Sequence, residues 1–135
     1  MVVIHCSATP PSMDIGAKEI RKWHVEDNGW RDIGYHLVIR RNGIAEGGRP
    51  LHVTPAAQRG YNKGSIAICL VGGVDQDNSP EDNFTLEQFE MLRTELLWLR
   101  DEYDIVSIVG HSDLANKDCP CFNVTDWVYH NLVRD

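Results

Sequence analysis

A histidine, a lysine and a cysteine lie close together near the end of the chain, in the segment GHSDLANKDCP of residues 110–120. His111 and Cys119 are eight residues apart, and both can reach one zinc ion if the loop between them folds back. Imidazole nitrogen and thiolate sulfur are ligands that Zn²⁺ prefers. Lys117 lies between them, where its positive charge can face whatever the metal holds. One such pair is a weak pattern, and an ordinary histidine with a buried cysteine is the better explanation of this segment taken alone.

A second histidine, close to the start of the chain, strengthens the interpretation as a metal site. His5 lies in VIHCSAT, on a strand predicted over residues 2–6, and a buried imidazole in a core strand needs a polar partner. Side chains alternate along a strand, so Cys6 faces the core if His5 faces a site. Together with His111 and Cys119, His5 supplies three protein ligands. Three ligands and an open fourth position are typical of a catalytic zinc site. A core histidine that is hydrogen-bonded to a neighbour is the alternative for His5.

Two further polar side chains begin a predicted hairpin, in GYHLVIRRNG. Tyr35 and His36 alternate in direction, so only one of them easily faces a given cleft. Tyr35 either covers the sheet edge or offers its phenol to the reacting groups. We expect a type I′ turn at Asn42-Gly43 between the two strands. The contexts of His24 and His130 favour surface or packing roles.

The elements that must position these residues follow a mixed order of strands and helices. We expect strands over residues 2–6, 36–40, 44–46, 65–71 and 105–109, and helices over residues 14–28, after residue 85 and after residue 123. This order predicts an α/β fold with a single mixed β-sheet flanked by helices, in one domain over residues 1–135. Functional sites in such sheets gather at the strand ends, where loops add groups to a rigid frame.

The helices have recognisable starting signals. Ser12 or Asp14 is expected to cap the helix of residues 14–28. Thr85 and Gln88 form a capping box for the clearest helix in the chain. Apolar residues spaced by three and four along this helix predict one core-facing stripe: Phe89, Leu92, Leu96, Leu99 and Tyr103. The last helix is expected to be capped by one of two residues: Asn123 or Thr125.

The composition narrows the class of function. The net charge of −7 argues against a nucleic-acid binder, which needs a basic face for phosphates. No segment is long and apolar enough to insert into a membrane, and no secretory signal is visible, so we expect synthesis in the cytoplasm. The four cysteines need not form disulfides, because 42% of the residues are hydrophobic and can build a core. Nothing in the sequence demands more than a monomer.

Several segments, in chain order, resemble one known family: IHCSAT, GYHLVIRRNG, GYNKGSIAICLVGG, NFT and the final H-x5-K-x-C-P. The sequence resembles the zinc-dependent N-acetylmuramoyl-L-alanine amidases, and most of all their bacteriophage lysozyme-type endolysins, which share a fold with peptidoglycan recognition proteins. The resemblance implies one zinc ion per chain and peptidoglycan as the partner. It further implies hydrolysis of the amide that joins N-acetylmuramic acid to L-alanine.

The resemblance also implies a role for individual residues. The zinc ligands would be His5, His111 and Cys119; the catalytic pair would be Tyr35 and Lys117; the substrate-binding residues would be Asn62 and His36. The proton shuttle is left open between Tyr35 and Lys117. One position departs from the family pattern, because Ala57 stands where relatives often carry a histidine, and His52 should not be assumed to replace it.

Two alternatives remain. A peptidoglycan-binding module of the same fold that has lost catalysis would typically lack a zinc ligand, often the cysteine, whereas this chain keeps Cys119. A cysteine hydrolase would use Cys119 with His111, independently of metal. We expect a phage or prophage enzyme that reaches the cell wall through a pore made by another protein, with an exported toxin as the other possible setting.

Overall fold

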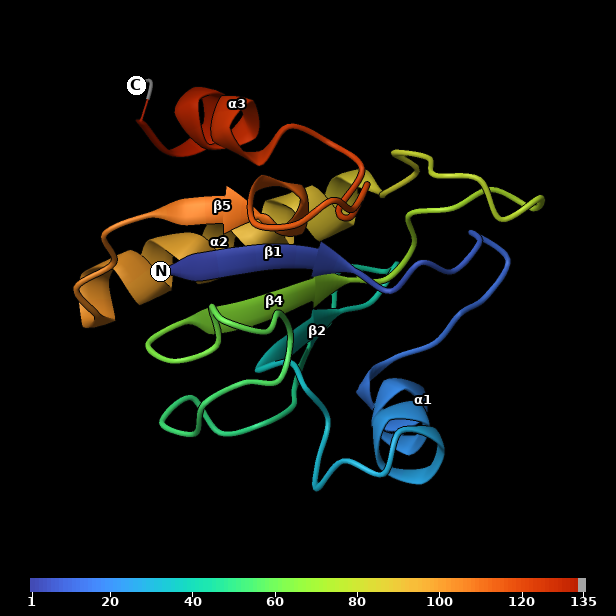
Figure 1. The fold of residues 1–135 in the computed structure, drawn as a ribbon. Coiled ribbons are helices and arrows are strands. Elements are labelled where there is room, and N and C mark those ends of the chain that lie inside the picture. Colours follow the sequence, from blue (N-terminus) through green and yellow to red (C-terminus); the bar gives the residue numbers. More distant parts are fainter. Residues whose placement is uncertain (134–135) are drawn as a thin grey trace.

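The structure is a computed structural model that describes residues 1–133, and it is built on one five-stranded sheet (Figure 1). The elements in chain order are β1 Val2–Cys6, α1 Ala17–Lys22, the π-helical turn η1 Trp23–Asp27, β2 Leu37–Ile39, β3 Ala45–Gly47, β4 Ile66–Leu70, α2 Leu86–Glu102, β5 Ile108–Gly110, the 3₁₀ turn η2 His111–Asp113, α3 Val124–Val128 and the π-helical turn η3 Tyr129–Val133. The strand order is β3-β2-β4-β1-β5, parallel throughout except for the antiparallel pair β2–β3. The predicted single mixed sheet flanked by helices is confirmed.

The two central strands are buried along their whole length, and both read as apolar runs, VVIHC in β1 and IAICL in β4. Parallel strands that are covered on both faces have this character. Helix α2 lies behind the sheet in Figure 1, where Leu92 and Leu96 belong to one core cluster with Ile4. Helix α1 lies on the opposite face, where Ile20 shares a second cluster with Cys69. His5 lies near the end of β1 and His111 directly after β5, whereas Tyr35 and His36 directly precede β2.

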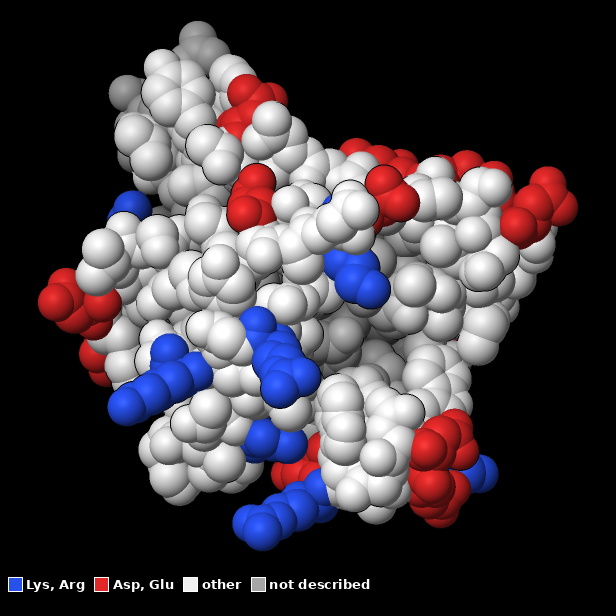
Figure 2. Space-filling model, in the orientation of Figure 1, with Lys and Arg blue, Asp and Glu red and all other residues white. Residues whose placement is uncertain are grey.

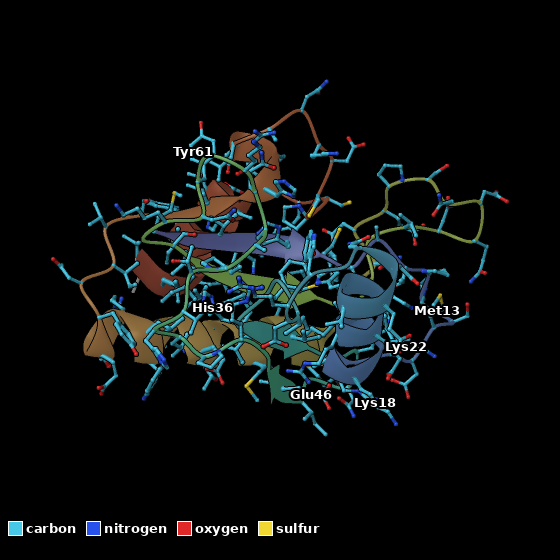
Figure 3. All side chains as sticks on the ribbon, turned by 60° about the horizontal axis from the view of Figure 1, so that its bottom comes forward. Met13, Lys18, Lys22, His36, Glu46 and Tyr61 are labelled. Atoms are coloured by element: carbon cyan, nitrogen blue, oxygen red, sulfur yellow. The ribbon has the colours of Figure 1, made fainter. Side chains whose placement is uncertain are left out.

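The first helix is shorter than the sequence predicts. The helix expected over residues 14–28 begins at Ala17, and neither Ser12 nor Asp14 caps it. The cap comes instead from Glu46 on β3, whose Oε1 accepts a hydrogen bond from the Ala17 amide at 2.8 Å; Figure 3 shows Glu46 beside this helix. A carboxylate from another strand thus satisfies a free amide of the first turn, and the local Glu19 accepts from the Gly16 amide at 3.0 Å.

The hairpin forms as predicted, but its turn is of a different type. The Gly43 amide donates to the Arg40 carbonyl at 2.8 Å, and the Arg40 amide donates to the Ile44 carbonyl at 2.9 Å. Only Gly43 has a positive φ, of 87°, whereas a type I′ turn requires one at Asn42 as well. The type I′ prediction is therefore wrong. The connection is a three-residue loop with glycine in the left-handed position.

The capping box of α2 is confirmed in both directions. The Gln88 amide donates to Thr85 Oγ1 at 3.1 Å, and the Thr85 amide donates to Gln88 Oε1 at 2.9 Å. The stripe is confirmed in its centre, where three leucines are at most 1% exposed: Leu92, Leu96 and Leu99. The prediction is wrong for Tyr103, whose side chain is 45% exposed. The helix ends at Glu102, so the extended backbone of Tyr103 turns its side chain away from the core.

The last strand begins later than predicted, and the structure decides between the two predicted caps of the last helix. Strand β5 begins at Ile108 rather than residue 105, because Ile108 pairs with Val2, the first residue of β1. Helix α3 is capped by Asn123, whose side chain accepts from the Asp126 amide at 3.0 Å, so the other candidate cap, Thr125, lies inside the first turn. Over the described residues, none of the helices combines the length and apolarity that a membrane span requires.

Candidate metal centre

The three predicted metal ligands meet at one edge of the sheet. His5 is the fourth residue of β1, and His111 follows directly after β5, its parallel neighbour. One ligand atom from each of His5, His111 and Cys119 lies within 4.8 Å of the others. Parallel neighbours end at the same edge, so the fold itself brings together two histidines that are far apart in the sequence.

The third ligand is positioned by two backbone contacts. The Ser112 amide donates to the Cys119 carbonyl at 2.8 Å, which folds the loop back toward His111. The Cys6 amide donates to Cys119 Sγ at 3.0 Å. Strand β5 stops opposite Ile4, so the Cys6 amide on that side has no strand partner and is free to bind the sulfur. The end of one strand thereby fixes the cysteine.

His5 has a nitrogen without a partner. Its side chain is 1% exposed, and its Nε2 is buried and makes no hydrogen bond within residues 1–133. An unpartnered buried polar atom is unfavourable, and native proteins rarely keep one without a reason. Burial, and secondarily the neighbouring His111, lower the pKa of His5 to about 3. The ring is therefore neutral at neutral pH, as a metal ligand must be. Two imidazoles and a thiol suit zinc, so these residues fit the metal.

His111 makes a contact that sequence reasoning missed. Its Nε2 lies 2.6 Å from Oε1 of Gln58, in the long loop between β3 and β4, while its ring centroid lies 4.6 Å from that of His5. Burial and the nearby Lys117 charge lower the pKa of His111. Gln58 is 53 positions away from His111, and no motif pointed to it. The sequence signals in its neighbourhood were Ala57, where the family pattern is broken, and Asn62, and neither pointed to Gln58 itself.

Tyr35 packs beside the cluster. Its ring centroid lies 5.2 Å from that of His5 and 5.5 Å from that of His24. Burial, with the nearby Cys69 thiol as a smaller cause, raises the pKa of Tyr35 well above its ordinary value. The phenol is therefore a hydrogen-bond donor at neutral pH. His24 accepts from the Gly34 amide at 2.9 Å, which confirms a packing role.

Comparisons with known proteins identify the family of this chain. The sequence profile of the N-acetylmuramoyl-L-alanine amidase family matches residues 1–122. The chain belongs to this family. It is 44% identical over 126 residues to the endolysin of Klebsiella phage KP32, and 42% identical over 126 residues to that of Escherichia phage T7. Each of these alignments covers 93% of this chain and 83% of the phage protein.

Solved structures share the fold of this amidase. The N-acetylmuramoyl-L-alanine amidase LysC from Clostridium intestinale URNW superposes with a TM-score of 0.82 at 25% identity, over 96% of this chain and 83% of that chain. PGRP-SA of Apis mellifera superposes with a TM-score of 0.79 at 20% identity, over 98% of this chain and 81% of that chain. The second likeness shows the fold alone.

Lys117 lies in the same loop as Cys119, the third predicted metal ligand. Its side chain is exposed and lines a cavity of about 490 Å³, whose lining includes none of the three predicted metal ligands. The rest of this lining includes Ser112 and the acidic Asp113 and Asp118. Figure 2 shows basic side chains toward the middle of the face in view and acidic ones mostly toward its edges. The charged residues in the lining of this cavity are mostly acidic, with Glu81, Asp82, Asp113 and Asp118 around Lys117.

The two predicted substrate-binding residues are already engaged by the protein. His36 is 3% exposed and points into the fold in Figure 3; its Nδ1 accepts from the Ala67 amide at 3.0 Å, and its Nε2 lies 2.7 Å from the Val53 carbonyl. Both nitrogens thus have backbone partners, and this geometry does not favour a substrate contact by His36. Asn62 Oδ1 accepts from the amides of Ala57 and Gln58, each at 2.9 Å, so it organises the loop. Its substrate contact stays a prediction.

Proposed function

We propose that this amidase is a zinc enzyme that hydrolyses the amide between N-acetylmuramic acid and L-alanine in peptidoglycan. One zinc ion per chain would be held by His5, His111 and Cys119. The observation that carries the metal assignment is the convergence of these three ligand atoms within 4.8 Å of one another. The unpartnered, buried Nε2 of His5 supports it.

The roles of the zinc ion and of the two catalytic side chains follow from their chemistry. Zinc, when bound, supplies Lewis-acid activation of water and of the amide carbonyl near neutral pH. The protonated phenol of Tyr35 and the cation of Lys117 stabilise the negative charge that develops on the carbonyl oxygen. Loss of one such donor commonly slows the reaction by about 10²–10³-fold. Both side chains are also able to deliver a proton to the departing amine.

The proposal extends to the partner and the setting. The whole chain, residues 1–135, would act as one catalytic domain and as a monomer, with peptidoglycan as its macromolecular partner. The amide nitrogen of Asn62 is the part of that side chain still able to face the substrate, because the oxygen is used within the loop. Synthesis in the cytoplasm followed by release to the cell wall fits the likeness to the phage endolysins.

The test is hydrolysis of purified peptidoglycan, with the products identified by mass before chelation, after chelation and after zinc is returned. We expect a new free amino group on L-alanine that disappears with chelator and reappears with zinc. Activity that is indifferent to chelation would favour a cysteine hydrolase built on Cys119. Binding to peptidoglycan without cleavage would indicate a recognition module.

A further inference from the structure

The contact between Gln58 and His111 determines which nitrogen of the histidine carries the proton. An amide oxygen only accepts hydrogen bonds, so a ring nitrogen 2.6 Å from Gln58 Oε1 must be the protonated one. The orientation of the amide is itself fixed, because Gln58 Nε2 donates to the Arg59 carbonyl at 3.3 Å. Turning the amide over would bring two oxygens together at Arg59 and leave the ring nitrogen facing a donor. The neutral ring of His111 therefore has its proton on Nε2 and its free lone pair on Nδ1.

The loop that carries Gln58 is held in place independently of His111. Asn62 Oδ1 accepts from the amides of both Ala57 and Gln58, and the Tyr61 amide donates to the Gln58 carbonyl at 3.0 Å. Ser65 Oγ then ties the Asn62 carbonyl to the start of β4 at 2.8 Å. Tyr61 lies at the outer end of this loop in Figure 3. The amide oxygen of Gln58 is thus presented to the ring by a backbone that is already fixed.

We propose that Gln58 is the positioning residue of the metal centre: it holds His111 in the tautomer and orientation in which Nδ1 faces the zinc ion. It acts through His111 and touches no reacting atom. A metal-binding histidine donates a hydrogen bond from the ring nitrogen that does not bind the metal. The group that accepts this bond fixes the tautomer and makes the ligand nitrogen more basic. For His111 this acceptor is the side chain of Gln58.

Gln58 is the neighbour of the one position in this loop that departs from the family pattern. It stands directly after Ala57, the residue that departs from the family pattern in the segment before GYN. The side chain of Ala57 has no polar atom to offer the site, whereas the next residue reaches His111. This chain therefore supplies a polar contact to the metal centre from that loop through Gln58.

The test compares two substitutions that separate shape from hydrogen bonding. Gln58→Met keeps an unbranched side chain of similar length but removes the acceptor, whereas Gln58→Glu keeps the acceptor. Lys63→Ala, an exposed change in the same loop, is the matched control. The first readout is the zinc dissociation constant, measured by competition with a chelating dye. The second is the ¹⁵N shift of each His111 ring nitrogen in the zinc-free protein at neutral pH, assigned by its loss in His111→Ala.

We expect the proton on Nε2 in the parent protein, in Gln58→Glu and in Lys63→Ala, and a mixture of tautomers in Gln58→Met. Zinc affinity should fall about 10–100-fold in Gln58→Met and be largely retained in Gln58→Glu. Equal affinity and an unchanged tautomer in Gln58→Met would overturn the proposal. Equal losses in both Gln58 variants would overturn it as well, because side-chain shape would then be the cause.

This inference rests on the proposed zinc site, but the two can fail separately. If the parent protein binds no zinc, the proposed function is wrong, whatever the tautomer of His111. If zinc binds and the tautomer does not depend on the residue at position 58, the metal site stands and the role of Gln58 is refuted.

Discussion

Gln88 is a polar side chain at the centre of the core, and its replacement gives the sharpest test of how the sheet is held. The residue is fully buried, at 0% exposed. Its Nε2 donates to the Ile39 carbonyl at 3.1 Å and to the Val71 carbonyl at 2.9 Å, while its Oε1 accepts from the Thr85 amide. Two hydrogen bonds therefore join the start of α2 to Ile39 of β2 and to Val71, directly after β4, and the third closes the capping box with Thr85.

The magnitude follows from what remains after the side chain is removed. The Ile39 carbonyl keeps a bond from the Val71 amide at 3.1 Å, and the Val71 carbonyl keeps one from Arg41 at 3.2 Å. Neither carbonyl is left without a donor, so each loss amounts to an ordinary net hydrogen bond of about 0.5–1.5 kcal/mol. Gln88→Met, which nearly preserves shape, should reduce the free energy of unfolding by about 2–4 kcal/mol.

A carboxylate at the same position should behave differently. Gln88→Glu places negative charge against two carbonyl oxygens, so its folded-state pKa should rise above the unfolded value of about 4.3. The stability of this variant should then be greatest below the unfolded pKa and should fall as the pH rises through the folded pKa. At neutral pH it should be less stable than Gln88→Met.

The assay is urea unfolding followed by circular dichroism at several pH values, with Glu90→Gln as an exposed control on the same helix. The control should change the unfolding free energy by no more than about 0.5 kcal/mol. A loss below about 0.5 kcal/mol in Gln88→Met would refute the hydrogen-bond reasoning. So would a Gln88→Glu variant that is as stable as the parent at neutral pH.

Two further predictions concern catalysis and the hairpin. Lys117→Ala should lower peptidoglycan hydrolysis by about 10²–10³-fold or more while zinc stays bound, whereas the exposed Lys22→Ala should hydrolyse normally; near-normal turnover in Lys117→Ala would exclude its catalytic role. Gly43→Ala should lower the unfolding free energy by about 2–4 kcal/mol, because φ is +87° and an added Cβ would lie 2.8 Å from the Glu87 carbonyl oxygen. Gly29→Ala, with φ +72° and open space around it, should lose only about 1–2 kcal/mol, and equal losses in the two variants would show that the contact with α2 is harmless.

Much of the fold could be predicted because the signals act over short distances. The capping box needs only Thr85 and Gln88, three positions apart, and the structure shows both of its hydrogen bonds. The apolar runs of the central strands indicated burial on both faces. The errors occur where a distant segment intervenes: Glu46 caps a helix that begins 29 positions earlier in the chain, so the expected local cap is not used.

In the candidate site, too, the sequence indicated some features and missed others. Residue type and spacing identified His5, His111 and Cys119, because few residue types bind zinc and the order of segments matched a family. The sequence did not indicate that both ring nitrogens of His36 bind the backbone, or that Asn62 organises its own loop. Those partners are backbone atoms, and every residue has them, so no sequence pattern marks them.

By itself, the sequence determined which side chains are able to do chemistry and which strand ends carry them. Only the tertiary structure decided how those side chains are oriented: the Cys6 amide fixes the sulfur of Cys119, and Gln58, 53 positions from His111, fixes its ring. Secondary structure depends mainly on neighbours in the chain, whereas the direction of a ligand atom depends on whichever segments the packed sheet brings against it.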